Sequence, residues 1–144
     1  MRNLFADYLS GSGECIALTL SKRPLGEEAL NAIEKSLENF GYGLDSCTYA
    51  TLSPIDRSVE GGDIALDAQA LFLMVEGLDP LFVICADEAS AHALGQAYRT
   101  AFPPDAPARI LGRPAVVFKD FPALMNSEKG KQKAWHLLKS LPKR

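Results

Sequence analysis

The sequence predicts an α/β fold, a three-layer α/β/α sandwich with a mainly parallel four-stranded sheet. Short apolar runs alternate along the chain with longer amphipathic segments, and each parallel pair of strands needs such a crossover helix. The length of 144 residues and an apolar fraction of 47% suit one globular core. We therefore expect residues 1–144 to form a single domain, with a short helix at 3–9 and the core within 14–141.

The first expected elements lie before residue 53. Apolar and aromatic residues fill 3–9, and the serines and glycines of 10–13 favour a turn. Glu14–Leu20 alternates large apolar residues with small ones, which predicts the first buried strand. Glu27–Phe40 repeats apolar residues every three or four positions and predicts an amphipathic helix. Ser46–Leu52 is rich in β-forming residues and predicts the second strand.

The middle of the chain repeats this alternation. After a polar loop, Ile64–Glu76 predicts a helix with Asp63 as its N-cap. Leu81–Ala86 is almost wholly apolar, as expected of a central parallel strand that is covered on both faces. Asp87 is placed to cap an alanine-rich helix over Glu88–Phe102, which the following prolines would end.

The last strand and helix follow residue 109. Gly112 and Pro114 interrupt Ile110–Phe118, which indicates either a tight hairpin-like bend or a loop that leads into a strand at Ala115–Phe118. The final helix is expected over Ser127–Leu141. Its buried side would hold Trp135, Leu138 and Leu141, with most of its lysines outside that stripe.

The net charge of −3 hides an asymmetry along the chain. Residues 1–108 hold 6 basic and 16 acidic side chains, a net charge of −10, whereas residues 109–144 hold 9 basic and 2 acidic ones, a net charge of +7. Two interpretations fit: a basic surface for a polyanion, or a terminal helix whose solvated face is rich in lysine.

Cysteine usage and hydropathy argue against metal-binding and membrane-spanning classes of protein. Cys15, Cys47 and Cys85 lie far apart in apolar segments, with no CxxC pair, so we expect buried free thiols and no metal or cofactor. No apolar run approaches the ~20 residues of a bilayer span, and the N-terminus lacks a signal layout. We expect a cytoplasmic protein with no membrane partner.

Ligands of open α/β sheets bind beyond the carboxyl ends of the strands, so the loops there are the candidate cleft. The candidate residues of these loops are Ser21, Lys22, Arg23, Leu52 and Asp87. The two cations could hold a phosphate, although solvated loop charges explain them equally simply. Asp87 and Glu88 could form an acid/base or Mg²⁺ pair, but helix capping explains both residues.

No catalytic constellation stands out in the sequence. His92 and His136 both fall within expected helices and have no serine or cysteine partner in a motif. An unrecognised hydrolase or transferase would need Asp56, Asp87 and Glu88 to converge in one pocket. The sequence therefore favours a protein that is not an enzyme.

Three long segments carry a resemblance to a known family. They are the helix Glu27–Phe40 with CTYATLSP at Cys47–Pro54, the stretch Ala70–Leu94, and GRPAVVFKDFPALMNSEKGKQKAWHLLKSL at Gly112–Leu141. In element order and in a few residues they resemble the uracil-DNA glycosylase superfamily, over about 80% of the chain. The resemblance implies the same α/β/α layering and a DNA-facing surface.

The departures from this family fall at its functional positions. Ser21–Pro24 stands where the family has a Gly-Glu/Gln-x-Pro loop that positions the hydrolytic water, and Leu52 where it has a base-reading Asn. Phe121-Pro122-Ala123 stands where it has a His-Pro-Ser loop. Cleavage of an N-glycosidic bond needs a positioned water, a held base and help to the leaving group. The resemblance therefore implies a degenerate, non-catalytic member.

Two binding functions remain as hypotheses. The first is a glycosylase-like module that binds DNA or RNA through a basic C-terminal surface, with Phe121 or Leu124 as an apolar wedge. Its candidate phosphate contacts are Lys119, Lys129, Lys131 and Lys133. The second is a protein-interaction domain or homodimer in which the acidic front of one chain meets the basic tail of another.

Overall fold

The structure is a computed structural model that describes residues 2–12, 14–43, 45–53 and 66–143. Its elements follow one another as the 3-10 helix η1 (Arg2–Tyr8), β1 (Leu9–Gly11), β2 (Ala17–Ser21), α1 (Glu27–Asn39), β3 (Cys47–Thr51), α2 (Ala68–Leu78), β4 (Phe82–Cys85), α3 (Glu88–Tyr98), β5 (Ala106–Ile110), β6 (Arg113–Val117), α4 (Phe121–Leu124) and α5 (Glu128–Leu138). The general α/β class is confirmed.

Within the described residues the sheet has six strands in the order β1-β3-β2-β4-β6-β5, so the predicted four-stranded sheet is wrong in its number of strands. The four central strands pair in parallel, and β1 and β5 are antiparallel edges. The sequence pattern missed both edges for physical reasons. β1 is only three residues long, and β5 contains Pro107, which lacks the N–H that a central strand must donate.

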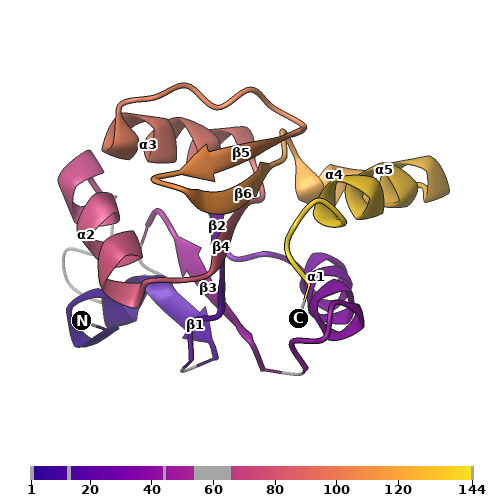
Figure 1. Ribbon diagram of the computed structural model, residues 1–144, viewed down its shortest axis with the longest axis horizontal. Helices are drawn as coiled ribbons and strands as arrows, with labels where there is room; N and C mark the ends of the chain where they lie inside the picture. The colour runs from indigo at the N-terminus through magenta and orange to yellow at the C-terminus, as the bar shows by residue number, and fades with distance from the viewer. Residues whose placement is uncertain (1, 13, 44, 54–65, 144) are drawn as a thin grey trace.

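Helices cover both faces of the sheet, which gives three layers (Figure 1). On one face α1, α4 and α5 pack around Ile33, Leu37 and Phe118. On the other face η1, α2 and α3 pack around Met74 and Leu94. Each central strand alternates its side chains between these two cores, which is why the strands read as nearly continuous apolar runs.

The N-terminal segment differs from its prediction. Helix η1 is a kinked 3-10 helix, with a non-helical residue at Phe5. The turn expected at 10–13 is wrong at Ser10 and Gly11, which pair with Tyr49 and Thr48 of β3. A Cβ on Gly11 would lie 2.7 Å from the carbonyl oxygen of Cys47, so the close approach of β1 to β3 requires glycine there.

The boundaries of α2 and α3 follow from their caps. Asp67 caps α2 by accepting a hydrogen bond from the Ala70 amide at 2.7 Å, four residues after the predicted cap; the predicted Ile64 start and Asp63 lie outside the described residues. Asp87 caps α3, as predicted. Helix α3 ends at Tyr98, short of the prolines, because Arg99 takes a left-handed conformation.

Of the two interpretations of residues 110–118, the hairpin-like bend is correct. β5 and β6 form an antiparallel hairpin, and Leu111 and Gly112 at its turn both have positive φ angles, 50° and 84°. Two successive positive φ angles match the twist of a two-residue hairpin. The first strand of this hairpin starts at Ala106, before the predicted bend.

Arg113 joins β6 to the ends of α2 and α3. Its guanidinium donates hydrogen bonds to Glu76 Oε2 at 3.0 Å, Asp79 Oδ1 at 2.9 Å and the carbonyl of Pro80 at 2.7 Å. The hydroxyl of Tyr98 donates to the same Glu76 oxygen at 2.7 Å. This bond, followed by the guanidinium, holds the pKa of the Glu76 carboxyl below its usual range.

None of the helices in the described part of the chain has the length and apolar character needed to cross a bilayer.

Candidate functional site

The loops that the sequence predicts as a cleft lie together at the carboxyl edge of the sheet. The Leu52 amide donates to the carbonyl of Ser21 at 3.1 Å, and the Lys22 amide donates to Asp87 Oδ2 at 2.8 Å. The backbone of Asp87 also forms an isolated antiparallel β-bridge with Asp120, which follows β6. β2 and β4 are neighbours here, and the chain leaves β2 toward β3 on the opposite side, which is the switch point of an open α/β sheet.

The polar groups at this edge hold the loops to one another. Both carboxylate oxygens of Asp87 accept backbone hydrogen bonds, Oδ1 from Ser90 and Oδ2 from Lys22, each at 2.8 Å. Ser21 is buried, and its hydroxyl donates to the carbonyl of Arg23 at 2.7 Å. Asp87 therefore acts as a helix cap that also fixes the loop after β2. Asp56 lies outside the described residues.

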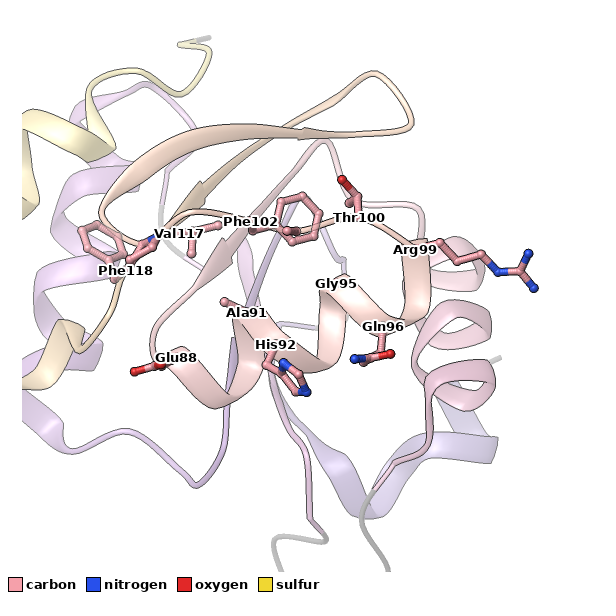
Figure 2. Close-up of a pocket in the computed structure, with 12 residues that line it drawn as sticks. Glu88, Ala91, His92, Gly95, Gln96, Arg99, Thr100, Phe102, Val117 and Phe118 are labelled. Atoms are coloured by element: carbon pink, nitrogen blue, oxygen red, sulfur yellow. The ribbon is translucent and has the colours of Figure 1, made fainter.

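A cavity of about 580 Å³ lies beside α3, against the end of β6 (Figure 2). One wall holds Phe102, Val117 and Phe118. In Figure 2 the polar side chains Glu88, His92 and Gln96 are spread along α3, and Arg99 points away from the cavity. Catalysis needs polar groups that converge on one point, and this arrangement does not supply them.

The candidate phosphate-binding lysines are all exposed, and two of them are paired with acids. Lys131 Nζ lies 3.8 Å from Glu28 Oε1 and 3.7 Å from Glu128 Oε1. Lys133 Nζ lies 3.2 Å from Asp105 Oδ2. Among the described residues, Lys119 and Lys129 form no ion pair. These carboxylates compete with any phosphate for Lys131 and Lys133.

Phe121, which the sequence suggests as an apolar wedge for DNA, is buried rather than exposed. Its side chain is fully buried and packs edge-on against Phe118, with ring centroids 4.9 Å apart. Phe121 begins the short helix α4, and Asp120 caps it by accepting from the Ala123 amide at 3.2 Å. Leu124, the other suggested wedge, is half-buried. Helix α4 was not predicted from the sequence because a helix of four residues is too short to show a hydrophobic period.

A groove of about 350 Å³ runs between α1 and α5. Its apolar floor comes from α4 and α5, and its rims are polar side chains of α1 and α5. The floor consists of Phe121, Met125, Ala134 and Leu138, and the rims include Glu28, Asn31, Lys35, Asn39 and Lys131. Helices α1, α4 and α5 cover the same face of the sheet (Figure 1), and the groove opens between α1 and α5. We call this surface the α1–α5 face.

Trp135 stands at the edge of this groove, and the prediction that it is buried is wrong. The residue is 38% exposed. Its ring stacks on Phe40 with centroids 5.3 Å apart and an interplanar angle of 23°. Helix α5 buries Gly130, Ala134 and Leu138, a stripe of four-residue spacing that turns Trp135 toward the surface.

The two helices that bound the groove carry opposite charge. Helix α1 holds four glutamates and one lysine, whereas α5 holds three lysines and one glutamate. Lys139 and Lys143 extend the basic side beyond α5. The charge asymmetry of the chain therefore becomes, in part, an asymmetry across a single face.

Two thiols lie in the interior, as predicted. Cys47 and Cys85 are buried, and burial raises the pKa of each thiol to about 12. Thr19 Oγ1 lies 3.3 Å from the Cys47 sulfur. The third cysteine, Cys15, is half-buried. Within the described ranges no group of three or more His, Cys, Asp or Glu side chains is placed to hold a metal ion.

Comparison with known proteins adds no relative: no protein-family model matches the chain. No curated protein matches it significantly either. Kinship with the uracil-DNA glycosylase superfamily stays a prediction from the sequence segments alone.

Proposed function

We propose that this chain is a protein-interaction domain that binds another protein through the α1–α5 face. The observation that carries the proposal is an apolar groove of about 350 Å³ with an exposed tryptophan at its edge and polar rims. Interfaces typically place aromatic side chains at an apolar centre and charges around it. A volume at the low end of ligand sites suits one or two side chains of a partner.

The charges around the groove favour a protein over a nucleic acid. A phosphate backbone that lay along α5 would pass close to α1, since Glu28 of α1 lies within 3.8 Å of Lys131 of α5. Glu27 and Glu38 add exposed negative charge to α1. A uniformly negative ligand gains from one helix and is repelled by the other. A protein can match both signs, because its surface carries both.

The proposal is tested by blocking the groove without removing a core side chain. Asn31 is exposed on its rim, so Asn31→Arg would fill the entrance and leave the packing intact. Gln96→Arg is the matched control, because Gln96 is exposed on the cavity beside α3. The full-length wild-type chain and both variants are immobilised to capture proteins from an extract of the producing cells. Each captured protein is then purified and titrated against the free chain.

Trp135 reports on occupancy of the face because it is the only tryptophan. We expect a captured protein to shift its emission to the blue, and we expect Asn31→Arg but not Gln96→Arg to abolish both capture and shift. Equal capture by all three chains would contradict the proposal. Capture that nuclease treatment removes would instead favour the nucleic-acid hypothesis, with Lys119 and Lys129 as the first phosphate contacts to mutate.

A further inference from the structure

We infer that the partner at the α1–α5 face is a second copy of this chain. The inference rests on the proposed function and names its partner. A protein that matches this face must place basic groups over α1 and acidic groups over α5. The chain itself carries those two sets of charges side by side, one on each of the two helices.

Two-fold symmetry brings these charges together in the required order. In an isologous dimer the same patch of both copies forms the interface, so a contact from α1 to the partner's α5 is always accompanied by its reciprocal contact. A two-fold axis that passes between α1 and α5 places the acidic helix of each copy over the basic helix of the other. Every favourable contact is then made twice.

The apolar centre fits the same arrangement. Trp135 projects beside the groove and is 38% exposed, although its stacking partner Phe40 is buried. Near a two-fold axis, the Trp135 side chain of each copy lies close to the groove of the other. Covering two indole rings and two apolar groove floors supplies the hydrophobic part of the interface.

The size of the α1–α5 face limits the expected affinity of the dimer. Helices of 13 and 11 residues extend for about 20 and about 17 Å at 1.5 Å per residue. Two such helices offer a patch near or below the ~800 Å² per partner of a standard interface. The dimer should therefore be in rapid exchange with monomer, and its affinity should fall as salt is added, because exposed charge pairs are screened.

The decisive experiment exchanges charge between the two helices. One variant, Glu27→Lys with Glu38→Lys, makes α1 basic, and the other, Lys129→Glu with Lys139→Glu, makes α5 acidic. All four residues are exposed and none forms an ion pair among the described residues. Each variant changes one charge near the start of a helix and one at its end, so the effects on the helix dipole oppose each other.

Sedimentation equilibrium of the full chain measures the dimer at low ionic strength and in 1 M salt, where the Debye length is about 3 Å. We expect wild type to dimerise at low salt, each variant alone to dimerise at least tenfold more weakly, and an equimolar mixture of the two to recover the wild-type affinity. In the mixture both α1-to-α5 contacts again pair opposite charges. The controls are Glu88→Lys at the start of α3 and Arg99→Glu at its C-cap, on the opposite face of the sheet, and they should leave dimerisation unchanged.

A chain that stays monomeric at every salt and protein concentration overturns the inference. A dimer that the charge variants do not weaken, or that mixing does not restore, also overturns it, because such a dimer uses another surface. These failures differ from failure of the proposed function. A monomeric chain that still captures a different protein in an Asn31-dependent manner would keep the interaction domain and replace its partner.

Discussion

Replacing Gly130 with alanine sets two effects of opposite sign against each other. Gly130 lies in the first turn of α5 and is buried. Alanine favours an exposed helix by about 1 kcal/mol over glycine. However, a Cβ on Gly130 would lie 2.2 Å from the Leu124 carbonyl oxygen and 2.9 Å from the Leu124 Cα and carbonyl carbon. All three atoms belong to the backbone, so no side-chain rotation relieves the clash.

We expect the cost of the clash to exceed the gain in helix propensity. Reaching an ordinary separation of roughly 3.5 Å requires α5 to move about 1 Å from α4. Overpacking of this kind costs about 1–3 kcal/mol, and a rigid backbone neighbour places the change at the upper end of that range. After the gain in helix propensity, we expect Gly130→Ala to lower the free energy of unfolding by about 2 kcal/mol, a fall in Tm of about 8 °C.

Urea and thermal unfolding followed by circular dichroism measure this change. Gly77→Ala is the matched control, since Gly77 is an exposed glycine within α2. There the helix-propensity term acts at an exposed position, and stability should rise by up to about 1 kcal/mol. A Gly130→Ala chain as stable as wild type would refute the reasoning that the junction between α4 and α5, which also forms the groove floor, is packed backbone against backbone.

Three further predictions follow from the same contacts. Arg113→Ala should lower the free energy of unfolding by about 2 kcal/mol in urea, because it removes hydrogen bonds to two carboxylates; an unchanged midpoint would contradict this. Since the Glu76 pKa is lowered in the fold, the stability it contributes is present at neutral pH and lost as the pH falls through that lowered pKa. The difference between wild type and Glu76→Gln should therefore close toward acid pH, and a constant difference would disprove the assignment. With a pKa of about 12 and no exposure, Cys47 and Cys85 should resist a thiol reagent at pH near 8 until urea unfolds the chain, and rapid labelling in native buffer would exclude their burial.

The central strands and their crossover helices were predictable because each signal is local. Leu81–Ala86 reads as a buried parallel strand because side chains of β4 face both cores, and the structure places β4 at Phe82–Cys85. Asp87 was predictable as a cap because its acceptor oxygen lies close to the amides of its own helix. Such features require no knowledge of distant residues.

The edge strands and the candidate face depend on contacts that a local pattern does not contain. β1 pairs with β3 about 40 residues later in the chain, and the three residues of β1 carry no local pattern that predicts this pairing. Lys133 reads as a free surface cation in the sequence, yet Asp105, 28 residues earlier, lies beside it. Phe121 reads as part of a loop because α4 is one turn long. The predicted DNA-facing surface consisted of such residues, so it is the part of the prediction that differs most from the structure.

Trp135 illustrates how a structural role and a binding role can share one side chain. The C-terminal segment is anchored beside it, since Leu141 is buried and the Tyr42 hydroxyl donates to the carbonyl of Pro142 at 2.6 Å. Lys143 Nζ lies 5.0 Å from the centre of the Phe40 ring, which Trp135 also contacts. Covering Phe40 explains why an aromatic residue stands at position 135. Covering Phe40 still leaves Trp135 38% exposed, at the edge of an apolar groove and between helices of opposite charge. A partner that presents the same face would remove that exposure on both sides at once.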